Sequence, residues 1–131
     1  MAAARPIVIA ANRLPVMRTS DGEWTPSPGG LVRALFPMLR ETGGTWVGWT
    51  GSVDDAPDPF SIDGVELHPI PISQTEYDDY YEGFSNDSLW PLYHDAMRDP
   101  TFKAEQWEAY VAVNRRFAAA LIEVAPRDAV I

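Results

Sequence analysis

Short apolar runs alternate with amphipathic helical segments along this chain, and that alternation constrains its fold more than any other feature. The runs are rich in β-branched or aromatic residues and have the length of buried strands; they are residues 6–11, 45–50 and 65–72. The segments with helical periodicity are residues 31–42, 74–84 and 103–124. This order predicts an α/β fold with a Rossmann-like, mostly parallel sheet.

Specific signals mark the ends of the predicted helices. Gly43 and Gly44 form a glycine C-cap for the first helix, and Ser73 with Glu76 forms a capping box for the second. The apolar face of the first helix is predicted to contain Leu31, Ala34, Leu35, Met38 and Leu39. The stripe on the last helix is predicted to contain Trp107, Tyr110, Val111, Phe117, Ala118, Leu121 and Ile122. Asn114 lies on the same stripe, where we expect packing and a hydrogen bond to a neighbouring loop.

The connecting segments carry further local signals. Residues 16–18 and 23–25 flank Ser20-Asp21-Gly22, which predicts a β-hairpin. Residues 51–64 are rich in Pro, Asp and Gly and predict a loop. Pro69 and Pro71 predict that the strand at 65–72 is irregular or lies at a sheet edge. A second short helix is expected at 87–94.

The length indicates one domain, and the carboxyl end is unusual for a complete one. Residues 129–131 begin what the pattern predicts to be a fourth strand, whereas a buried strand normally has about five or six residues. We therefore expect residues 1–131 to be a single amino-terminal Rossmann-like domain that is truncated at its carboxyl end.

Composition limits the cellular locations and the binding partners that we expect for this chain. The chain has no cysteine, which excludes disulfides. The opening apolar run, residues 7–11, is interrupted by Asn12 and Arg13 and is too short for a secretion signal or a membrane span. We therefore expect a cytoplasmic protein with no membrane partner. The net charge of −9 argues against nucleic acid. Five arginines against two acids in residues 1–40 favour an anionic ligand there.

The first candidate site combines Asn12-Arg13, at the carboxyl end of the first strand, with Gly29-Gly30 at the start of a helix. Ligands of open α/β sheets bind beyond the carboxyl ends of strands. A helix amino terminus offers free N–H groups to an anion, glycine allows close approach, and arginine suits phosphate geometry. The alternative is an ordinary loop with a solvated arginine, which the pattern alone favours because a lone Gly-Gly lacks nucleotide-fingerprint spacing.

The second candidate is the aromatic segment from Tyr80 to Trp90. Tyrosine and tryptophan present an apolar body and a polar tip, which suits the face and hydroxyls of a sugar. The alternative is that the apolar side chains of this segment belong to the core, which we expect for Phe84 and Leu89. Tyr80 and Tyr81 are adjacent, so both cannot face inward from a helix, and one is expected to be exposed for a functional reason.

Other chemistries find no support in the sequence. The two histidines, His68 and His94, lie on separate elements without ligand-spaced partners, so no metal site is expected. No Walker motif, nucleophile elbow or cysteine nucleophile is present.

Five ordered motifs resemble those of the trehalose-6-phosphate synthases. They are Asn12-Arg-Leu-Pro-Val16, Ser27-Pro-Gly-Gly-Leu31, Trp46-Val-Gly-Trp49, Tyr80-Tyr-Glu-Gly-Phe-Ser-Asn86 with Leu89-Trp-Pro91, and Tyr110-Val-Ala-Val-Asn114. The resemblance implies the incomplete N-terminal domain of a GT-B glycosyltransferase, which has two Rossmann-like domains facing across a cleft. Such an enzyme transfers glucose, with retention, from UDP-glucose or another nucleotide-glucose to glucose 6-phosphate. No cofactor is implied, and the full-length protein is expected to form a homo-oligomer.

The resemblance also implies a role for each matching residue. Arg13, Tyr81 and Trp90 match acceptor-binding residues, and Gly29 and Gly30 match glycines at the donor diphosphate. It implies a front-face displacement in which the leaving phosphate helps to deprotonate the acceptor, with no protein nucleophile and no catalytic residue in this segment. The family's His-Asp-Tyr-His segment and its second domain, with the donor-binding Arg and Lys, are absent, so we expect no activity from this chain alone.

Two other hypotheses remain at this stage. One is a non-catalytic sugar-phosphate-binding module of the same fold. The other is a structural or interaction domain whose arginines and aromatics have no chemical role.

Overall fold

The computed structural model describes residues 4–94 and 99–131, and its centre is a four-stranded sheet. In spatial order the strands are β1 (Val8–Arg13), β4 (Gly44–Trp49), β6 (Val65–Pro69) and β5 (Phe60–Ile62). β1 and β6 pair with β4 in parallel, and β5 pairs with β6 in antiparallel orientation. The predicted α/β class with a mostly parallel sheet is confirmed.

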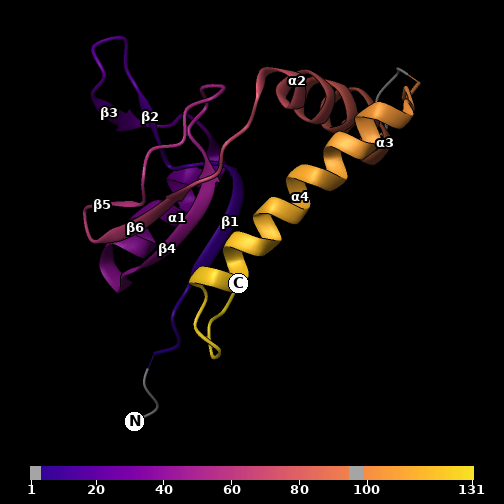
Figure 1. The fold of residues 1–131 in the computed structure, drawn as a ribbon. Helices are drawn as coiled ribbons and strands as arrows, with labels where there is room; N and C mark the ends of the chain where they lie inside the picture. The colour runs from indigo at the N-terminus through magenta and orange to yellow at the C-terminus, as the bar shows by residue number, and fades with distance from the viewer. Residues whose placement is uncertain (1–3, 95–98) are drawn as a thin grey trace.

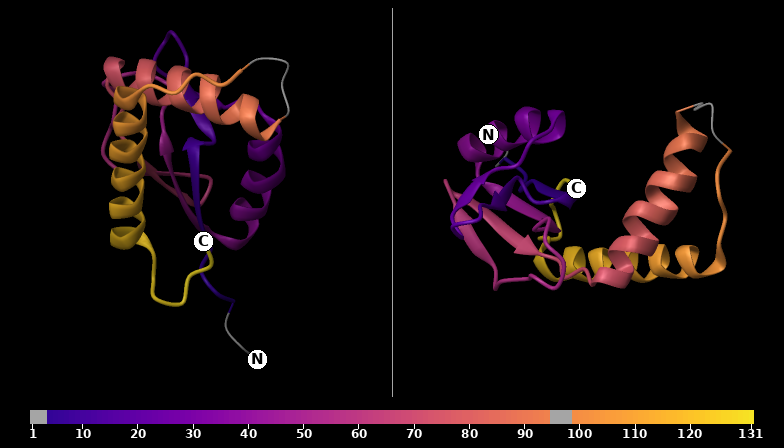
Figure 2. Two further views of the ribbon diagram at one scale, coloured as in Figure 1. Left: turned by 90° about the vertical axis from the view of Figure 1, so that its right-hand side faces the viewer. Right: turned by 90° about the horizontal axis from the view of Figure 1, so that it is seen from above.

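Two helices cover opposite faces of this sheet (Figures 1 and 2). They are α1 (Gly30–Thr42) and α4 (Ala104–Val124). α1 buries Val32, Phe36 and Leu39 against a core that includes Trp46 and Leu67. The predicted face of this helix is confirmed for Leu35, Met38 and Leu39, which pack on the core, and wrong for Leu31 and Ala34, which are exposed. Apolar residues occur on more than one side of the helix, so periodicity alone does not identify every residue that meets the sheet.

The opposite face carries a second core, formed by Trp49, Ile72, Tyr80 and Val113. In α4, the predicted stripe is confirmed for Tyr110, Val111, Phe117 and Leu121, which are half-buried. Other members are exposed, among them Trp107 at 52% and Ile122 at 83%. Asn114 donates a 2.8 Å hydrogen bond to the Tyr110 carbonyl of its own helix, so the expected bond to a loop is wrong.

The predicted hairpin is confirmed as β2 (Val16–Arg18) paired with β3 (Trp24–Pro26). The ring of Trp24 stacks on Phe60 of β5, with centroids 4.7 Å apart. This stacking fastens the hairpin to the far edge of the sheet, beside the loop that enters α1.

β5 was missed, because residues 51–64 were predicted to be a loop. The turn that joins β5 to β6 contains Asp63 and Gly64, both with positive φ (52° and 80°). Asp-Gly is a known hairpin signal, so this strand was detectable from the sequence. Since β5 covers β6, this strand is internal rather than at an edge; Pro69 is its last residue, and Pro71 lies beyond it.

Residues 74–93 form one continuous helical segment, not two helices with a break near Phe84. It consists of α2 (Gln74–Glu76), the π-helix η1 (Tyr77–Leu89) and α3 (Trp90–Tyr93). The capping box is confirmed, with Ser73 accepting from the Glu76 N–H and Glu76 accepting from the Ser73 N–H. Arg116 pairs with Glu76 at 2.6 Å and so fastens the start of this segment to α4.

The predicted fourth strand is represented by one parallel bridge between Ile7 and Val130. The Val8 N–H donates to the Val130 carbonyl at 2.9 Å, and the Val130 N–H donates to the Pro6 carbonyl at 2.8 Å. The last residues therefore lie beside the free edge of β1. Among the described residues, no helix combines the length and the apolar character needed to cross a membrane.

Candidate functional site

A cavity of about 510 Å³ opens at the carboxyl end of β1. Its lining includes Arg13, Gly29, Gly30, Trp46 and Tyr81. These residues come from the strands β1 and β4, the start of α1 and η1, so the cavity lies where two helical elements meet the end of the sheet. This is the position at which open α/β sheets bind ligands.

A β-bulge aims Arg13 at this cavity. The pairing of β1 with β4 shifts between Ala10 and Arg13, opposite Gly48. A methyl group on Gly48 would lie 2.7 Å from the Arg13 carbonyl carbon and 2.8 Å from the Leu14 nitrogen, so only glycine allows this approach. Bulges of this kind redirect side chains at functional sites.

The Arg13 side chain is a cation without a carboxylate partner among the described residues. Its guanidinium carbon lies 5.1 Å from the ring centroid of Trp49. Its main-chain oxygen accepts a 2.9 Å hydrogen bond from the Trp46 indole nitrogen, which fixes the backbone at this point. The arrangement leaves guanidinium N–H groups available to an anion.

The start of α1 forms a second anion-attracting feature on the same cavity. No side chain caps this helix terminus in the described structure, and its first turn has no acidic residue. Gly29 has a φ of 132°, which favours glycine, and a Cβ placed on Gly30 would meet no atom within 4 Å. The backbone N–H groups of the first turn are therefore open to the cavity.

An aromatic cluster supports Tyr81, which lines the cavity. Trp49 lies 5.5 Å from Tyr77 and 6.0 Å from Tyr81, and the two tyrosines stack at 5.5 Å. The Tyr77 hydroxyl donates a 2.7 Å hydrogen bond to Glu82, and this bond raises the pKa of Tyr77. The sequence did not identify Trp49 or Tyr77 as supports of Tyr81, although Trp49 belongs to the motif Trp46-Val-Gly-Trp49.

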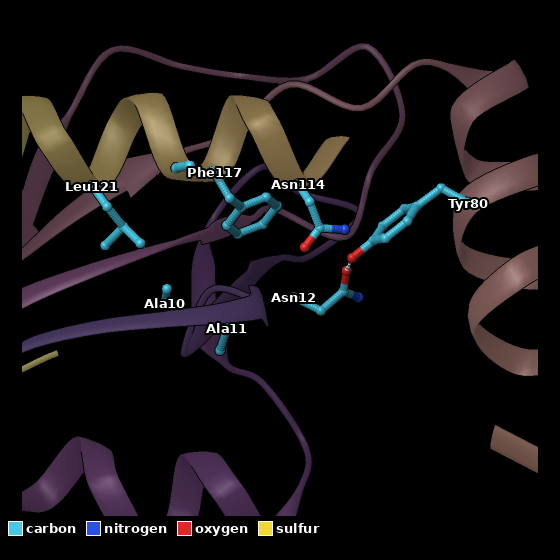
Figure 3. A pocket seen from close by; sticks show the side chains of 8 residues that line it. Ala10, Ala11, Asn12, Tyr80, Asn114, Phe117 and Leu121 are labelled. Carbon is cyan, nitrogen blue, oxygen red and sulfur yellow. Dashed lines mark hydrogen bonds between the residues drawn. The ribbon is translucent and has the colours of Figure 1, made fainter. Parts of the chain in front are cut away.

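The neighbouring residue, Tyr80, is buried and donates a 2.7 Å hydrogen bond to the Asn12 side-chain oxygen. Figure 3 shows the polar ends of Asn12, Asn114 and Tyr80 turned toward one another at a second cavity, of about 350 Å³, between β1 and α4. Burial raises the pKa of Tyr80 to about 12, so its hydroxyl stays protonated at neutral pH. The two adjacent tyrosines thus divide as expected, with Tyr80 inward and Tyr81 on the cavity.

Trp90 is placed apart from the other predicted site residues. It is 53% exposed and stacks on His94, with ring centroids 4.2 Å apart. It lines neither cavity. The structure therefore gathers Arg13, Gly29, Gly30 and Tyr81 but not Trp90. In the part of the chain that the structure describes, no three His, Cys, Asp or Glu side chains are grouped to hold a metal.

Comparison with known proteins gives a consistent picture. The sequence profile of glycosyltransferase family 20 matches residues 5–131. The trehalose-6-phosphate synthase of Mycolicibacterium smegmatis is 49% identical over 128 residues, which is 95% of this chain and 25% of that protein. The Mycobacterium avium enzyme of the same name is 51% identical over 132 residues, which is 95% of this chain and 27% of that protein. The chain thus spans about a quarter of the length of these relatives.

Solved structures agree with the sequence relatives. An α,α-trehalose-phosphate synthase from Burkholderia vietnamiensis superposes with a TM-score of 0.76 at 29% identity, over 96% of this chain and 26% of that one. A Burkholderia xenovorans enzyme of the same name, solved in complex with glucose-6-phosphate, superposes with a TM-score of 0.75 at 31% identity. The match covers 98% of this chain and 27% of that one. The fold is therefore that of a part of a GT-B glycosyltransferase.

Proposed function

This chain belongs to glycosyltransferase family 20, and from that membership we propose that it supplies the acceptor side of a trehalose-6-phosphate synthase. The complete enzyme would transfer glucose from UDP-glucose, or another nucleotide-glucose, to glucose 6-phosphate with retention of configuration. In this proposal residues 1–131 form its amino-terminal domain, in part.

The observation that carries the proposal is that one cavity faces two separate anion-attracting features. Arg13 lies on one side and the amino terminus of α1, at Gly29-Gly30, on another. A reaction between a sugar phosphate and a nucleotide sugar brings two phosphate-bearing groups together. We assign Arg13 to the acceptor phosphate and Gly29-Gly30 to the donor diphosphate.

The ring of Tyr81 supports a sugar as the group that is held between Arg13 and the start of α1. Tyr81 lines the cavity and is braced by Trp49 and Tyr77. A rigid aromatic face with a hydroxyl tip can pack on a sugar ring and accept or donate a hydrogen bond. Trp90 receives no such support from the arrangement of this cavity, and its acceptor-binding role stays a prediction.

The lining also agrees with a mechanism that positions the reactants without a protein nucleophile. Among the described residues that line the cavity, none is a carboxylate. The paired carboxylates that most retaining glycoside hydrolases use are thus missing from this lining. What this lining would contribute is charge and orientation, through Arg13, the open N–H groups of α1 and the Tyr81 ring.

The alternative is a sugar-phosphate-binding module without catalysis, which the comparisons do not favour, because the matching family is a glycosyltransferase family and the relatives are named synthases. It would use the same Arg13 and Tyr81 and lack a donor reaction. A cytoplasmic location and a homo-oligomeric full-length protein also stay predictions.

Calorimetry and a chimeric enzyme test the proposal together. The 131-residue chain should bind glucose 6-phosphate more tightly than glucose, and should release no UDP when given UDP-glucose and glucose 6-phosphate. A chimera in which it replaces the matching segment of the Mycolicibacterium smegmatis enzyme should make trehalose 6-phosphate. A folded but inactive chimera would favour the binding module, and a chain that does not distinguish glucose 6-phosphate from glucose would contradict both candidates.

A further inference from the structure

Two pairs of sequence neighbours meet at the site, and one hydrogen bond joins them. Asn12 precedes Arg13 at the end of β1, and Tyr80 precedes Tyr81 in η1. Arg13 and Tyr81 line the cavity from two different elements, and Asn12 lines it beside Arg13, whereas Tyr80 lies outside the lining and donates a 2.7 Å hydrogen bond to Asn12. This bond therefore fixes the backbones of β1 and η1 relative to each other, and with them the positions of Arg13 and Tyr81.

From this arrangement we propose that Tyr80 is a positioning residue: the hydrogen bond that its hydroxyl donates to Asn12 holds Arg13 and Tyr81 at the separation that a phosphorylated sugar requires. The inference rests on the proposed function, because it assigns Arg13 to the phosphate and Tyr81 to the sugar. Tyr80 itself does not line the 510 Å³ cavity and so acts through its neighbours.

The environment of the bond suits this role. Tyr80 is 8% exposed, and its ring packs on Tyr110 of α4, with centroids 6.0 Å apart. The ring position is thus set by helix packing, and the hydroxyl transmits that position to β1. Shielding from water strengthens such a bond relative to an exposed one. Among the described residues, no hydrogen bond joins Arg13 to Tyr81 directly, so their separation depends on contacts of this kind.

Variants of both partners test the hydrogen bond, and Tyr80→Phe is the decisive one, because Asn12 itself lines the cavity and Tyr80 does not. Tyr80→Phe removes the hydroxyl and keeps the ring, and Asn12→Leu removes the acceptor with little change in volume. Tyr110→Phe is the matched control, because Tyr110 belongs to the same aromatic group but its hydroxyl has no hydrogen bond in the described structure. The double variant Tyr80→Phe with Asn12→Leu completes the cycle.

The experiment measures glucose 6-phosphate affinity of the 131-residue chain by calorimetry, together with its urea unfolding midpoint. We expect Tyr80→Phe to weaken affinity about 2- to 10-fold, the effect of one neutral hydrogen bond. The double variant should be no weaker than the Asn12→Leu single variant, and Tyr110→Phe should bind like the unmodified chain. A merely structural role predicts instead that affinity falls in proportion to stability in every variant.

Amide hydrogen exchange gives a readout that does not need a ligand. In Tyr80→Phe, exchange should accelerate at Arg13 and Tyr81 while the amides of β6 keep their protection. If the unmodified chain fails to bind glucose 6-phosphate, the acceptor assignment fails, and this exchange pattern alone decides the positioning role. Unchanged exchange at Arg13 and Tyr81, or additive losses of affinity in the double variant, would overturn the inference.

Discussion

The guanidinium of Arg13 lies over the ring of Trp49, with 5.1 Å between its central carbon and the ring centroid. The same tryptophan ring contacts Tyr81, which lines the cavity with Arg13. One aromatic side chain therefore braces both the cation and the aromatic face of the candidate site. This pre-arrangement lowers the cost of ordering the two groups when a ligand binds.

Replacing Arg13 should weaken acceptor binding selectively. A charge-assisted hydrogen bond to phosphate contributes about 1.5–3 kcal/mol, so Arg13→Ala should lower glucose 6-phosphate affinity by roughly 10-fold or more. The affinity of Arg13→Lys should lie between those of Arg13→Ala and the unmodified chain, because lysine keeps the charge and loses the planar guanidinium. Calorimetry on the chain and the acceptor KM of the chimera measure the effect. Equal affinity in Arg13→Ala and the unmodified chain would remove Arg13 from the site.

Substitution of Gly30 distinguishes a role in ligand binding from a role in folding. A Cβ at this position meets no atom within 4 Å and its φ is not positive, so Gly30→Val should fold with a nearly unchanged unfolding midpoint. Its side chain should obstruct the open N–H groups of α1 and raise the donor KM of the chimera. Gly30→Ala should have a smaller effect. A destabilised Gly30→Val protein with normal donor kinetics would instead show that the glycine serves the turn.

Gly48 should tolerate no side chain. A methyl group there would lie 2.7–2.9 Å from backbone atoms of Ala11, Arg13 and Leu14, which belong to the bulge and cannot rotate away. Gly48→Ala should therefore cost about 1–3 kcal/mol of unfolding free energy and also disturb Arg13. Gly64→Ala offers a comparison, since Gly64 has an open surrounding but a φ of 80°. Urea denaturation measures both, and a Gly48→Ala chain as stable as the parent would refute the close approach.

The Glu76–Arg116 pair should make stability depend on acidic pH. The hydrogen bond from Arg116 lowers the pKa of Glu76 below its ordinary value of 4.5. A lowered folded-state pKa stabilises the protein above pH 4.5, and this contribution is lost as the pH falls through the folded-state value. Glu76→Gln should therefore cost about 1 kcal/mol at neutral pH, because it removes the charge that Arg116 pairs with, while a glutamine amide oxygen can still accept from the Ser73 N–H.

Urea unfolding of Glu76→Gln and its parent across acidic pH measures this effect, and their difference should shrink as the pH drops. Asp63→Asn is the control, since Asp63 and Arg40 form a 3.2 Å pair with both side chains half exposed. It should change stability by less than about 0.5 kcal/mol. A constant difference between Glu76→Gln and its parent at every pH would argue against the ion pair.

Local patterns predicted much of the candidate site. The Asp21-Gly22 turn, the Ser73 capping box and the start of α1 depend on residues within a few positions of each other, and all three appear in the structure. Patterns failed where several solutions fit the same residues. The full set of α1 residues that meet the sheet is one example, and the continuation of the helix past Phe84 as a π-helix is another.

The sequence by itself determined the α/β alternation and placed Arg13 and Gly29-Gly30 at the same end of the sheet, because the carboxyl ends of parallel strands share an edge. Only the tertiary structure decided that Trp49 braces Arg13 and Tyr81, and that Trp90 lies away from them. These distances depend on the bulge opposite Gly48 and on how the helical segment 74–93 packs against α4. Such relationships join residues far apart in the chain, and no local periodicity encodes them.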